Sequence, residues 1–288
     1  MSVTVIGDAF VDIIVPVKDI RPGEAYYKKI AILCGGTANV AVQIAKLGGS
    51  SKFVGCIGND PFGEYFRQNL QGNGVRGLIF VDDENPTGLC ISMAYDDGEK
   101  AMVANRGAND FLKSENIDAY LNEIINSNII YFSGYSLLSQ QSAEAVLSVI
   151  KKCYTRNCEI YFNPGAANLI KENFKEIIKE FVDVLIVNMD EAMKLTGKSN
   201  IREILDFLGD FVNLLVITLS GNGCIVSNGK RYKQVKTEKL VFSDTTGAGD
   251  AFAAGFIVGR LRGMNEIDCA KLGNESALRF LKEKDTLL

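Results

Sequence analysis

Short, almost continuously apolar runs alternate along the chain with longer segments in which apolar residues recur at helical spacing. The short runs lie at residues 3–6, 52–56, 129–132, 159–162, 184–187 and 214–218. The helical segments lie between them, at residues 37–47, 62–70, 139–152, 173–181 and 201–208. Strands that are apolar on both faces and joined by helices are typical of a parallel sheet covered on both sides. The pattern predicts an α/β fold with a doubly wound, mostly parallel sheet.

Two stretches, at residues 9–33 and 87–104, depart from this alternation. The second holds alternating strands at 88–94 and 100–104 around a turn at 96–98, with no helix between them. Because no helix separates their strands, we expect the two stretches to form antiparallel ribbons that pair as a small β-sheet lid. A lid of this kind suits an enzyme that must exclude water from its substrate. The alternative is that they are edge hairpins of the main sheet. Without repeats or Pro/Ser-rich linkers, a single domain over residues 1–288 with this inserted lid is the simplest organisation.

Composition and charge narrow the classes of protein to consider. The 288 residues are 47% hydrophobic and 23% charged, an ordinary globular balance that excludes a mostly disordered chain. The net charge of −4 and the lack of a dense Lys/Arg run give no support for nucleic-acid binding. The sequence contains no histidine, which excludes Ser-His-Asp and Cys-His nucleophiles and imidazole zinc sites. Catalysis would therefore use carboxylates, Lys, Arg, backbone amides or a bound metal.

The cysteine spacing and the amino-terminal residues indicate the cellular compartment of the protein. The seven cysteines are scattered and include no C-x-x-C pair, which favours buried thiols in a reduced, cytoplasmic protein. Residues 1–12 lack a basic region before their apolar run, so we interpret them as a first strand instead of a signal peptide. No run approaches the roughly 18 apolar residues that a membrane span needs, so no membrane partner is expected.

The strongest chemical signal is the segment Asp-Thr-Thr-Gly-Ala-Gly-Asp-Ala-Phe at residues 244–252. It follows a β-type stretch at 239–242 and opens a helical run at 250–262. Gly247 and Gly249 would let the backbone turn tightly beside the free N–H groups of a helix start, where an anion can bind. In the first turn the helix dipole would keep Asp250 ionised, as a general base requires. The alternative is that Asp250 only caps its helix and the glycines only turn the chain.

As a whole, this segment resembles the second signature of the ribokinase-like (PfkB) carbohydrate kinase family. The resemblance implies that Asp250 is the catalytic base and that the amides of Gly247, Ala248 and Gly249 form an anion hole for the γ-phosphoryl group. Residues 54–63 are similar to the first signature of the family, which we interpret as scaffold. The similarity runs in the family's order over nearly the whole chain, which implies a ribokinase-like fold.

Two further segments resemble the nucleotide and metal elements of this family. Asn188 and Glu191 are similar to its Asn-x-x-Glu element, which implies that Glu191 helps to hold Mg²⁺ through water and that Asn188 lies near the phosphates. As an isolated pair they would be a helix cap and its partner. Residues 218–223 resemble the nucleotide-binding turn, although Ser220 stands where the family usually has glycine; the alternative is an ordinary hairpin turn. The ATP contacts so implied are Asn188, Glu191, Thr218, Ser220, Gly221, Gly223 and Gly249.

The amino-terminal third carries the residues that the resemblance assigns to the substrate. Residues 7–12 are similar to the family's first strand and turn, which implies that Asp12 accepts hydrogen bonds from substrate hydroxyls. Asn39 matches the end of the Gly-Gly-x-x-x-Asn element. Gly35 holds the second glycine place of that element, Cys34 replaces the first glycine, and Gly36 follows. The implied substrate contacts are Asp12, Gly35, Gly36, Asn39, Arg106 and Asp250.

Other positions depart from ribokinase proper or extend the expected site. Ribokinase proper has a lysine at the Gly36 place and an asparagine at the Phe10 place, so strict ribose specificity is not expected. Phe10 would suit a nucleoside base or would simply be a core aromatic residue. Arg106 would pair with a substrate carboxylate or phosphate, or would be a solvated surface arginine. The resemblance also implies a monovalent cation, such as K⁺, beside Asp244 and Thr246.

The sequence therefore predicts an ATP-dependent, Mg²⁺-using kinase that phosphorylates a primary hydroxyl of a sugar or sugar acid. The alternatives are a nucleoside kinase of the same superfamily and a catalytically silent sugar- or nucleotide-binding protein. A Rossmann oxidoreductase is disfavoured, because no Gly-x-Gly-x-x-Gly follows the first strand. We also expect a homodimer formed through an apolar lid face that includes Ile91, Met93 and Val103.

Overall fold

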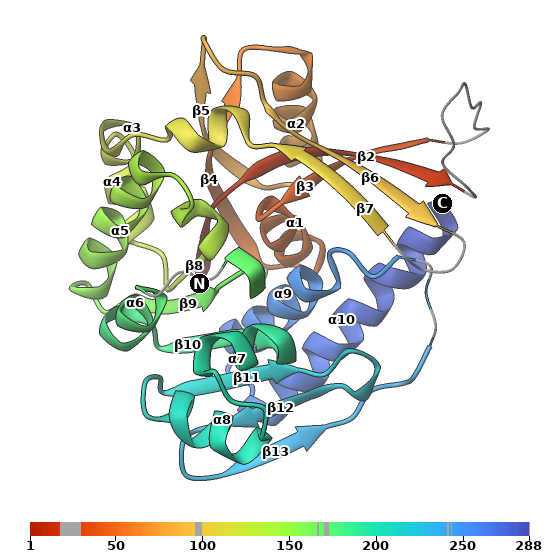
Figure 1. The fold of residues 1–288 in the computed structure, drawn as a ribbon. Coiled ribbons are helices and arrows are strands. Elements are labelled where there is room, and N and C mark those ends of the chain that lie inside the picture. Colours follow the sequence, from red (N-terminus) through yellow and green to blue (C-terminus); the bar gives the residue numbers. More distant parts are fainter. Residues whose placement is uncertain are drawn as a thin grey trace.

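The computed structural model describes residues 1–17, 30–95, 100–165, 167–169, 173–240, 242 and 244–287 (Figure 1). Within these residues a larger sheet has nine strands, in the order β13-β12-β11-β10-β9-β8-β1-β4-β5. The strands of this sheet are β1 (Ser2–Ile6), β4 (Ser50–Gly58), β5 (Arg76–Asp82), β8 (Ile129–Ser133), β9 (Glu159–Asn163), β10 (Val184–Asn188), β11 (Leu214–Thr218), β12 (Cys224–Ser227) and β13 (Tyr232–Val235). In this order, every pair of neighbouring strands from β11 through β10, β9, β8, β1 and β4 to β5 is parallel. The pairs β11–β12 and β12–β13 are antiparallel. The predicted doubly wound, mostly parallel sheet is confirmed.

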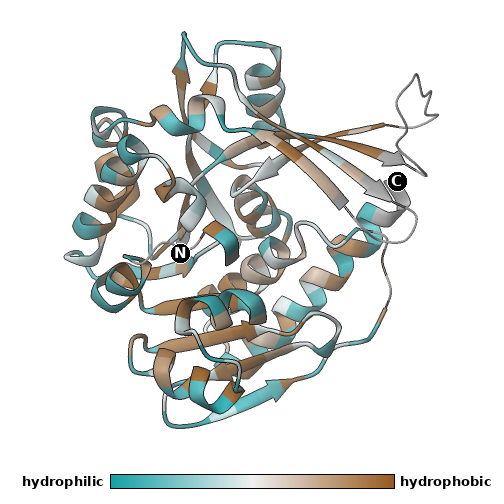
Figure 2. Ribbon diagram, viewed as in Figure 1, coloured by the Kyte–Doolittle hydropathy of each residue, from teal (hydrophilic) through white to brown (hydrophobic). Residues whose placement is uncertain are grey.

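Helices cover both faces of this sheet. They are α1 (Ala38–Lys46), α2 (Pro61–Gly72), α3 (Ser114–Asp118), α4 (Leu121–Ile125), α5 (Gln140–Tyr154), α6 (Phe174–Phe181), α7 (Met189–Thr196), α8 (Ile201–Gly209), α9 (Ala248–Leu261) and α10 (Glu266–Leu287). One buried cluster includes residues of α3 to α8, and a second includes residues of α1, α2, α9 and α10. Neighbouring strand residues alternate between the clusters, so that Val5 belongs to one and Ile6 to the other. Burial on both faces explains why β10 and β11 are almost wholly apolar (Figure 2).

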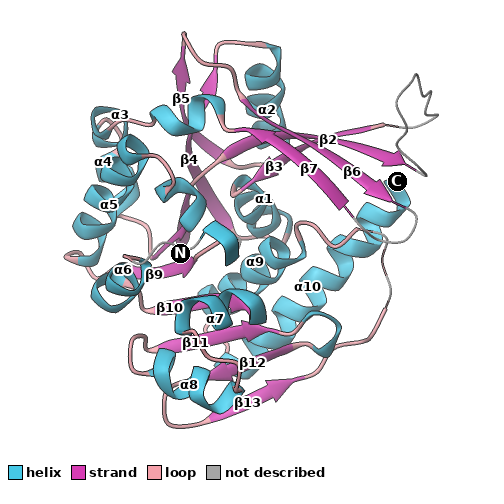
Figure 3. Cartoon of the chain, viewed as in Figure 1, coloured by secondary structure: helices cyan, strands magenta, loops and turns pink. Residues whose placement is uncertain are grey.

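A smaller sheet has the order β3-β2-β6-β7 among the described residues. It consists of β2 (Ala9–Val17), β3 (Ala31–Gly36), β6 (Gly88–Tyr95) and β7 (Lys100–Asn105). Each ribbon is antiparallel, and the two ribbons join through a parallel pairing of β2 with β6. Figure 3 shows this sheet extending beyond α1 towards the C-terminal end of α10. The predicted smaller sheet is confirmed, and none of its described strands pairs with the larger sheet.

Three parts of the pattern were interpreted incompletely. The edge strands β5 and β13 were missed because each has only one buried residue, which removes the continuous apolar signal. The short helices α3 and α4 were also missed. The β-type stretch expected at 239–242 is wrong, since residues 239, 240 and 242 are irregular and residue 241 is not described. Residues 18–29 and the turn predicted at 96–98 also lie outside the described residues.

None of the helices in the described part of the chain has the length and apolarity that crossing a membrane requires.

Candidate active site

The start of α9 is the centre of the candidate site. Helix α9 begins after Gly247, whose φ of 87° is a left-handed conformation that glycine adopts readily. A Cβ atom at Gly247 would also lie 2.8 Å from the ring of Phe280 in α10. Glycine is therefore required at this position by backbone conformation and by close packing. The tight turn places Asp250 in the first turn of α9.

The first turn of α9 has N–H groups available for an anion. The N–H groups of Gly247, Gly249 and Asp250 have no hydrogen-bond acceptor among the residues that the structure describes. Gly249 is exposed, and a Cβ atom there would meet nothing within 4 Å. The N–H of Ala248 differs from our expectation, because it donates to the carbonyl of Thr245 at 3.2 Å. The available donors are thus those of Gly247, Gly249 and Asp250, at a helix end that favours anions.

The carboxylate of Asp250 is half-buried beside α1. Its Oδ2 accepts a hydrogen bond from Nδ2 of Asn39 at 3.3 Å. Burial raises the pKa of Asp250 to about 7, the Asn39 hydrogen bond acts to lower it, and the charge of Asp12 adds to the rise. Our expectation that the helix dipole keeps this group ionised is therefore incomplete. The dipole contributes at most about 2 kcal/mol at a partly buried position, and the desolvation of the carboxylate outweighs it.

Asp12 lies on β2, and the alternation of the strand puts Phe10 on the same face. A Cβ atom at Gly35, on neighbouring β3, would lie 2.1 Å from Oδ2 of Asp12. Glycine at position 35 therefore makes room for this carboxylate. Burial raises the pKa of Asp12 to about 6, while the charge of Lys284 lowers it and that of Asp244 raises it.

Polar residues end successive parallel strands at one edge of the larger sheet. Ser133 is aligned with Asn163 across β8 and β9, and Asn188 is aligned with Thr218 across β10 and β11. Ligands of open α/β sheets bind outside the carboxyl ends of such strands. The alignment brings the two segments that we assigned to the nucleotide, at 188–191 and 218–223, next to each other.

Glu191 is a buried carboxylate that also caps its helix. Its Oε2 accepts the N–H of Asn188 at 3.0 Å, its Oε1 accepts Nδ2 of Asn188 at 2.6 Å, and Asn163 donates to Oε2 at 3.4 Å. Burial raises the pKa of Glu191 to about 7; the Asn188 and Asn163 hydrogen bonds lower it, and the charges of Asp190 and Asp250 raise it. The capping interpretation of Asn188 and Glu191 is confirmed. Glu191 also lies close enough to Asp250 for their charges to interact.

Three carboxylates near this edge have no basic partner. In the described part of the chain, no Lys or Arg nitrogen lies within 4.0 Å of Asp12, Glu191 or Asp250. Nor do the described residues hold a cluster of three or more acidic or thiol groups that could coordinate a metal by themselves. An unpaired, buried Glu191 suits Mg²⁺, which typically takes one or two carboxylates together with water and phosphate oxygens.

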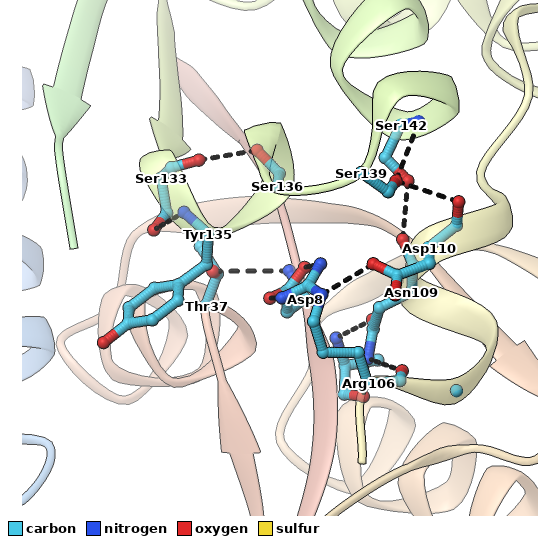
Figure 4. A network of polar contacts seen from close by, with 12 residues as sticks. Asp8, Thr37, Arg106, Asn109, Asp110, Ser133, Tyr135, Ser136, Ser139 and Ser142 are labelled. Carbon is cyan, nitrogen blue, oxygen red and sulfur yellow. Dashed lines mark hydrogen bonds and ion pairs between the residues drawn. The ribbon is translucent and has the colours of Figure 1, made fainter. Parts of the chain in front are cut away.

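The guanidinium of Arg106 is held by the protein's own carboxylates (Figure 4). Nη1 donates to Oδ2 of Asp8 at 2.6 Å, Nη2 to Oδ1 of Asp8 at 3.2 Å, and Nε to Oδ1 of Asp110 at 2.6 Å. Neighbouring Asn109 accepts the N–H of Ala9 at 2.7 Å and donates to the carbonyl of Ala9 at 2.9 Å. Arg106 is thus not a solvated surface arginine, because its guanidinium is paired with Asp8 and Asp110. That it also pairs with a substrate carboxylate or phosphate stays a prediction. It ties the end of β7 to the start of β2.

The turn at 218–223 joins β11 to antiparallel β12, so the hairpin interpretation is confirmed. Ser220 adopts a φ of 49°, the left-handed conformation that its family place usually fills with glycine. Gly223 has a φ of 83°, and a Cβ atom there would lie 2.0 Å from the carbonyl oxygen of Val235. Ser220 and Gly221 are exposed beside the end of β11.

Asp244 and Thr246, the residues expected beside a monovalent cation, both contact Lys284 of α10. Nζ of Lys284 lies 2.6 Å from Oδ2 of Asp244 and donates to the carbonyl of Thr246 at 3.0 Å. Sequence reasoning missed Lys284 and also Asn163. The position of Asn163 at the end of a buried strand was a usable signal, whereas no local pattern marks Lys284.

Known proteins resemble this chain over nearly its whole length. A family model described as "pfkB family carbohydrate kinase" matches residues 1–286. Aminoimidazole riboside kinase of Salmonella typhimurium is 28% identical over 266 residues, which cover 89% of this chain and 80% of that protein. Ribokinase of Lactococcus lactis is 28% identical over 275 residues, which cover 94% and 87%. The crystal structure of adenosine kinase from Sinorhizobium meliloti has a TM-score of 0.90 at 26% identity, covering 98% of this chain and 94% of that one.

Proposed function

Because the chain belongs to the pfkB family of carbohydrate kinases, we propose that it transfers the γ-phosphoryl group of ATP to a primary hydroxyl of a sugar or sugar acid. The observation that carries this proposal is the carboxylate of Asp250 beside the N–H groups of Gly247, Gly249 and Asp250 itself, which have no acceptor among the described residues. Phosphoryl transfer depends mainly on positioning and on stabilising charge, and this arrangement supplies both.

Asp250 acts as the general base that accepts the proton of the attacking hydroxyl. Its pKa of about 7 is well matched to this task, because a base works best when its pKa lies near the working pH. Asn39 orients the carboxylate through Oδ2. The N–H groups of Gly247 and Gly249 bind the phosphoryl oxygens at the start of α9, where the helix dipole favours negative charge.

The sugar lies between the smaller sheet and α9. Asp12 accepts hydrogen bonds from its hydroxyls, Gly35 and Gly36 let the sugar approach the backbone, and Asn39 contacts both the sugar and Asp250. The smaller sheet acts as a lid over this place and excludes water, which strengthens the electrostatic interactions inside. Arg106, held by Asp8 and Asp110, sets the position of the lid relative to the larger sheet.

The nucleotide lies along the carboxyl ends of β10 and β11. Thr218, Ser220, Gly221 and Gly223 surround the nucleotide, and Asn188 lies near its phosphates. Glu191 would hold Mg²⁺ through water. When bound, Mg²⁺ neutralises charge on the phosphate oxygens.

A nucleoside kinase is the second candidate function. The ring of Phe10 supports it: Cδ2 lies 3.2 Å from the place of a Cβ at Gly36, and Phe10 shares the face of β2 with Asp12. An aromatic ring there would stack on a base. The high TM-score with an adenosine kinase points the same way. Competitive assays with adenosine, cytidine, ribose, fructose and 2-keto-3-deoxygluconate would separate the two functions.

The smaller sheet also supports a homodimer. Its pairing places Ile32, Ile91 and Val103 in one row, and these side chains are 48%, 38% and 67% exposed. A second copy would cover this apolar row, and light scattering over a range of concentrations would test it. All seven cysteines are free thiols, which suits a reducing compartment such as the cytoplasm.

The proposed function is tested by ADP release in the presence of ATP, Mg²⁺ and the same sugar and nucleoside panel. Asp250→Asn should lower kcat by about 10² to 10⁴, because an amide cannot accept the proton. Asp206→Asn, which changes an exposed aspartate of α8, is the matched control and should keep full activity. ATP binding without ADP release across the whole panel would favour the catalytically silent alternative.

A further inference from the structure

The place where a monovalent cation was expected already holds a positive charge. Lys284, Asp244 and Thr246 close a ring of contacts: Nζ of Lys284 binds Asp244 and the carbonyl of Thr246, and Oδ1 of Asp244 accepts the N–H of Thr246 at 2.9 Å. The side chains of Lys284 and Asp244 are only 7% and 1% exposed. Among ion pairs between described residues, this is the most enclosed.

A K⁺ ion does not fit beside this lysine. It would need the same carboxylate and carbonyl oxygens that the ammonium group of Lys284 occupies. A second cation would also stand against a like charge in a place with little water to screen the repulsion. The residues present therefore do not support the monovalent-cation site that we expected at Asp244 and Thr246.

The packing of α10 against α9 positions Lys284 beside Asp244 and Thr246. A Cβ atom at Gly255 of α9 would lie 2.4 Å from Oγ of Ser276, and the ring of Phe280 packs on Gly247. Residues 276, 280 and 284 are four apart and share one face of the helix. The same face thus contacts the middle of α9, the glycine that starts it, and the loop that precedes it.

The contact with Lys284 also shapes the anion-binding turn. Gly247 is the N-cap of α9, so the N–H groups of the first turn, that of Asp250 included, have no partner within the helix. The backbone just before the helix sets where these donors point. Lys284 binds that backbone at the carbonyl of Thr246 and, through Asp244, at the N–H of Thr246. Lys284 therefore holds the loop that orients these donors.

We propose that Lys284 is a built-in monovalent cation that positions the loop at 244–246, and with it the anion-binding start of α9, so that the kinase needs no K⁺. Lys284 is a positioning residue, because it acts through Asp244 and Thr246 and not on the phosphoryl group directly. The part of this inference that concerns turnover rests on the proposed kinase function.

The experiment compares wild type, Lys284→Met and Lys271→Met in KCl, NaCl and N-methylglucamine chloride at one ionic strength. Lys271 is the matched control, an exposed lysine of the same helix paired with Asp268. Wild type and Lys271→Met should give the same kcat in all three salts. Lys284→Met should lose about 10- to 100-fold in kcat without K⁺, the range for residues that orient a functional group. The KM for the sugar should change less, and K⁺ or NH₄⁺ should restore part of kcat.

Melting temperature in the same salts gives a readout that needs no substrate. K⁺ should raise the melting temperature of Lys284→Met, because a cation that binds only the folded state stabilises it, and should leave wild type unchanged. A K⁺ requirement or K⁺-specific stabilisation of wild type would overturn the proposal. So would a Lys284→Met protein with full kcat in the absence of K⁺, or a folded one that K⁺ neither activates nor stabilises. If no substrate is turned over, the proposed kinase function fails, while the melting temperatures still decide the cation site.

Discussion

Two neighbouring parts of the molecule treat their polar groups in opposite ways. Where the smaller sheet joins the larger one, Asp8 is paired with Arg106, and Asn109 satisfies both backbone groups of Ala9 (Figure 4). At the candidate active site, Asp250 and Glu191 have no basic partner among the described residues. At the same edge, the N–H groups of Gly247, Gly249 and Asp250 have no acceptor within the part of the chain that the structure describes.

The difference indicates that the candidate site keeps carboxylates that lower the stability of the fold, whereas the junction between the sheets does not. Burial raises the pKa of both Asp250 and Glu191 to about 7, so each costs free energy when it ionises in the folded protein. Groups of this kind persist where a ligand satisfies them, and they are typical of functional sites. We therefore expect changes at the junction to lower stability, and changes at the site to lower activity while stability stays the same or rises.

The largest expected effect on stability comes from breaking the junction. Arg106→Met would leave the carboxylate of Asp8, which is 4% exposed, without its partner. Removing one member of a buried pair costs about 3 to 5 kcal/mol, because an uncompensated charge remains inside. Urea unfolding at pH 8 should show this loss in the free energy of unfolding. The loss of stability should become smaller towards pH 5, since burial already raises the pKa of Asp8 and the unpaired carboxylate would take up a proton.

An exposed pair gives the matched control for this change. Arg76 and Glu123 form two hydrogen bonds of 2.7 Å, but their side chains are 59% and 36% exposed. Arg76→Met should cost much less than Arg106→Met, because water screens an exposed ion pair. Equal losses for Arg106→Met and Arg76→Met would contradict the view that the junction is a tightly paired support.

The next largest effect is expected on catalytic efficiency, from a substitution that displaces the carboxylate of Asp12. Gly35→Ala would put a methyl group 2.1 Å from the present position of Oδ2 of Asp12, so the carboxylate must move. A shift of about 1 Å in a substrate-binding group can cost up to about 100-fold. We expect kcat/KM for the sugar to fall by about 10- to 100-fold, chiefly through KM, in steady-state assays. Gly72→Ala, at a position where a Cβ atom meets nothing within 4 Å, should leave kcat/KM unchanged.

Removing the charge of Asp250 should stabilise the fold in a pH-dependent way. The pKa of this group is about 7 in the folded protein and 3.8 in its ordinary, exposed state. Between these values the folded protein binds more protons than the unfolded chain, so wild-type stability falls as pH rises. Asp250→Asn cannot ionise and escapes this loss.

The advantage of Asp250→Asn should thus grow from pH 4 upwards and level off above the folded pKa of about 7. For a half-buried group we expect a gain of about 1 to 3 kcal/mol at pH 8, allowing for solvent screening. Urea unfolding from pH 4.5 to 8.5 measures it. A variant that is less stable than wild type at pH 8 would show that the carboxylate is satisfied within the protein, and the contrast with Asp8 would be lost.

The sequence was sufficient wherever the controlling contacts are local or fill both faces of a strand. The strands β8, β10 and β11 have almost entirely buried residues, so their apolar runs stand out. The turn from Gly247 to Asp250 and the cap formed by Asn188 and Glu191 each lie within four residues. Their geometry follows from helix-start chemistry that the sequence displays directly.

The sequence was insufficient where a group's state depends on a distant partner. Arg106 meets Asp8 across 98 positions of the chain, and Lys284 meets Thr246 across 38. No spacing rule links such residues. The same limit explains why the raised pKa of Asp250 was not predicted. The sequence indicates the helix start at this residue, but it does not show the burial that raises the pKa to about 7.

The smallest expected effect concerns backbone strain at the same edge of the sheet. Ser220 holds a φ of 49°, a conformation that costs a residue with a Cβ about 1 to 2 kcal/mol. Ser220→Gly removes that strain but adds roughly 0.5 to 1 kcal/mol of unfolded-state entropy, so the net gain should be about 0.5 kcal/mol. Differential scanning calorimetry should show a rise of about 1 to 2 °C. Asn157, with a φ of 57° away from the site, is the control, because asparagine tolerates this conformation and Asn157→Gly should give no gain. If Ser220→Gly lowers stability, the turn at 218–223 is not one of the places where the protein has given up stability for its site.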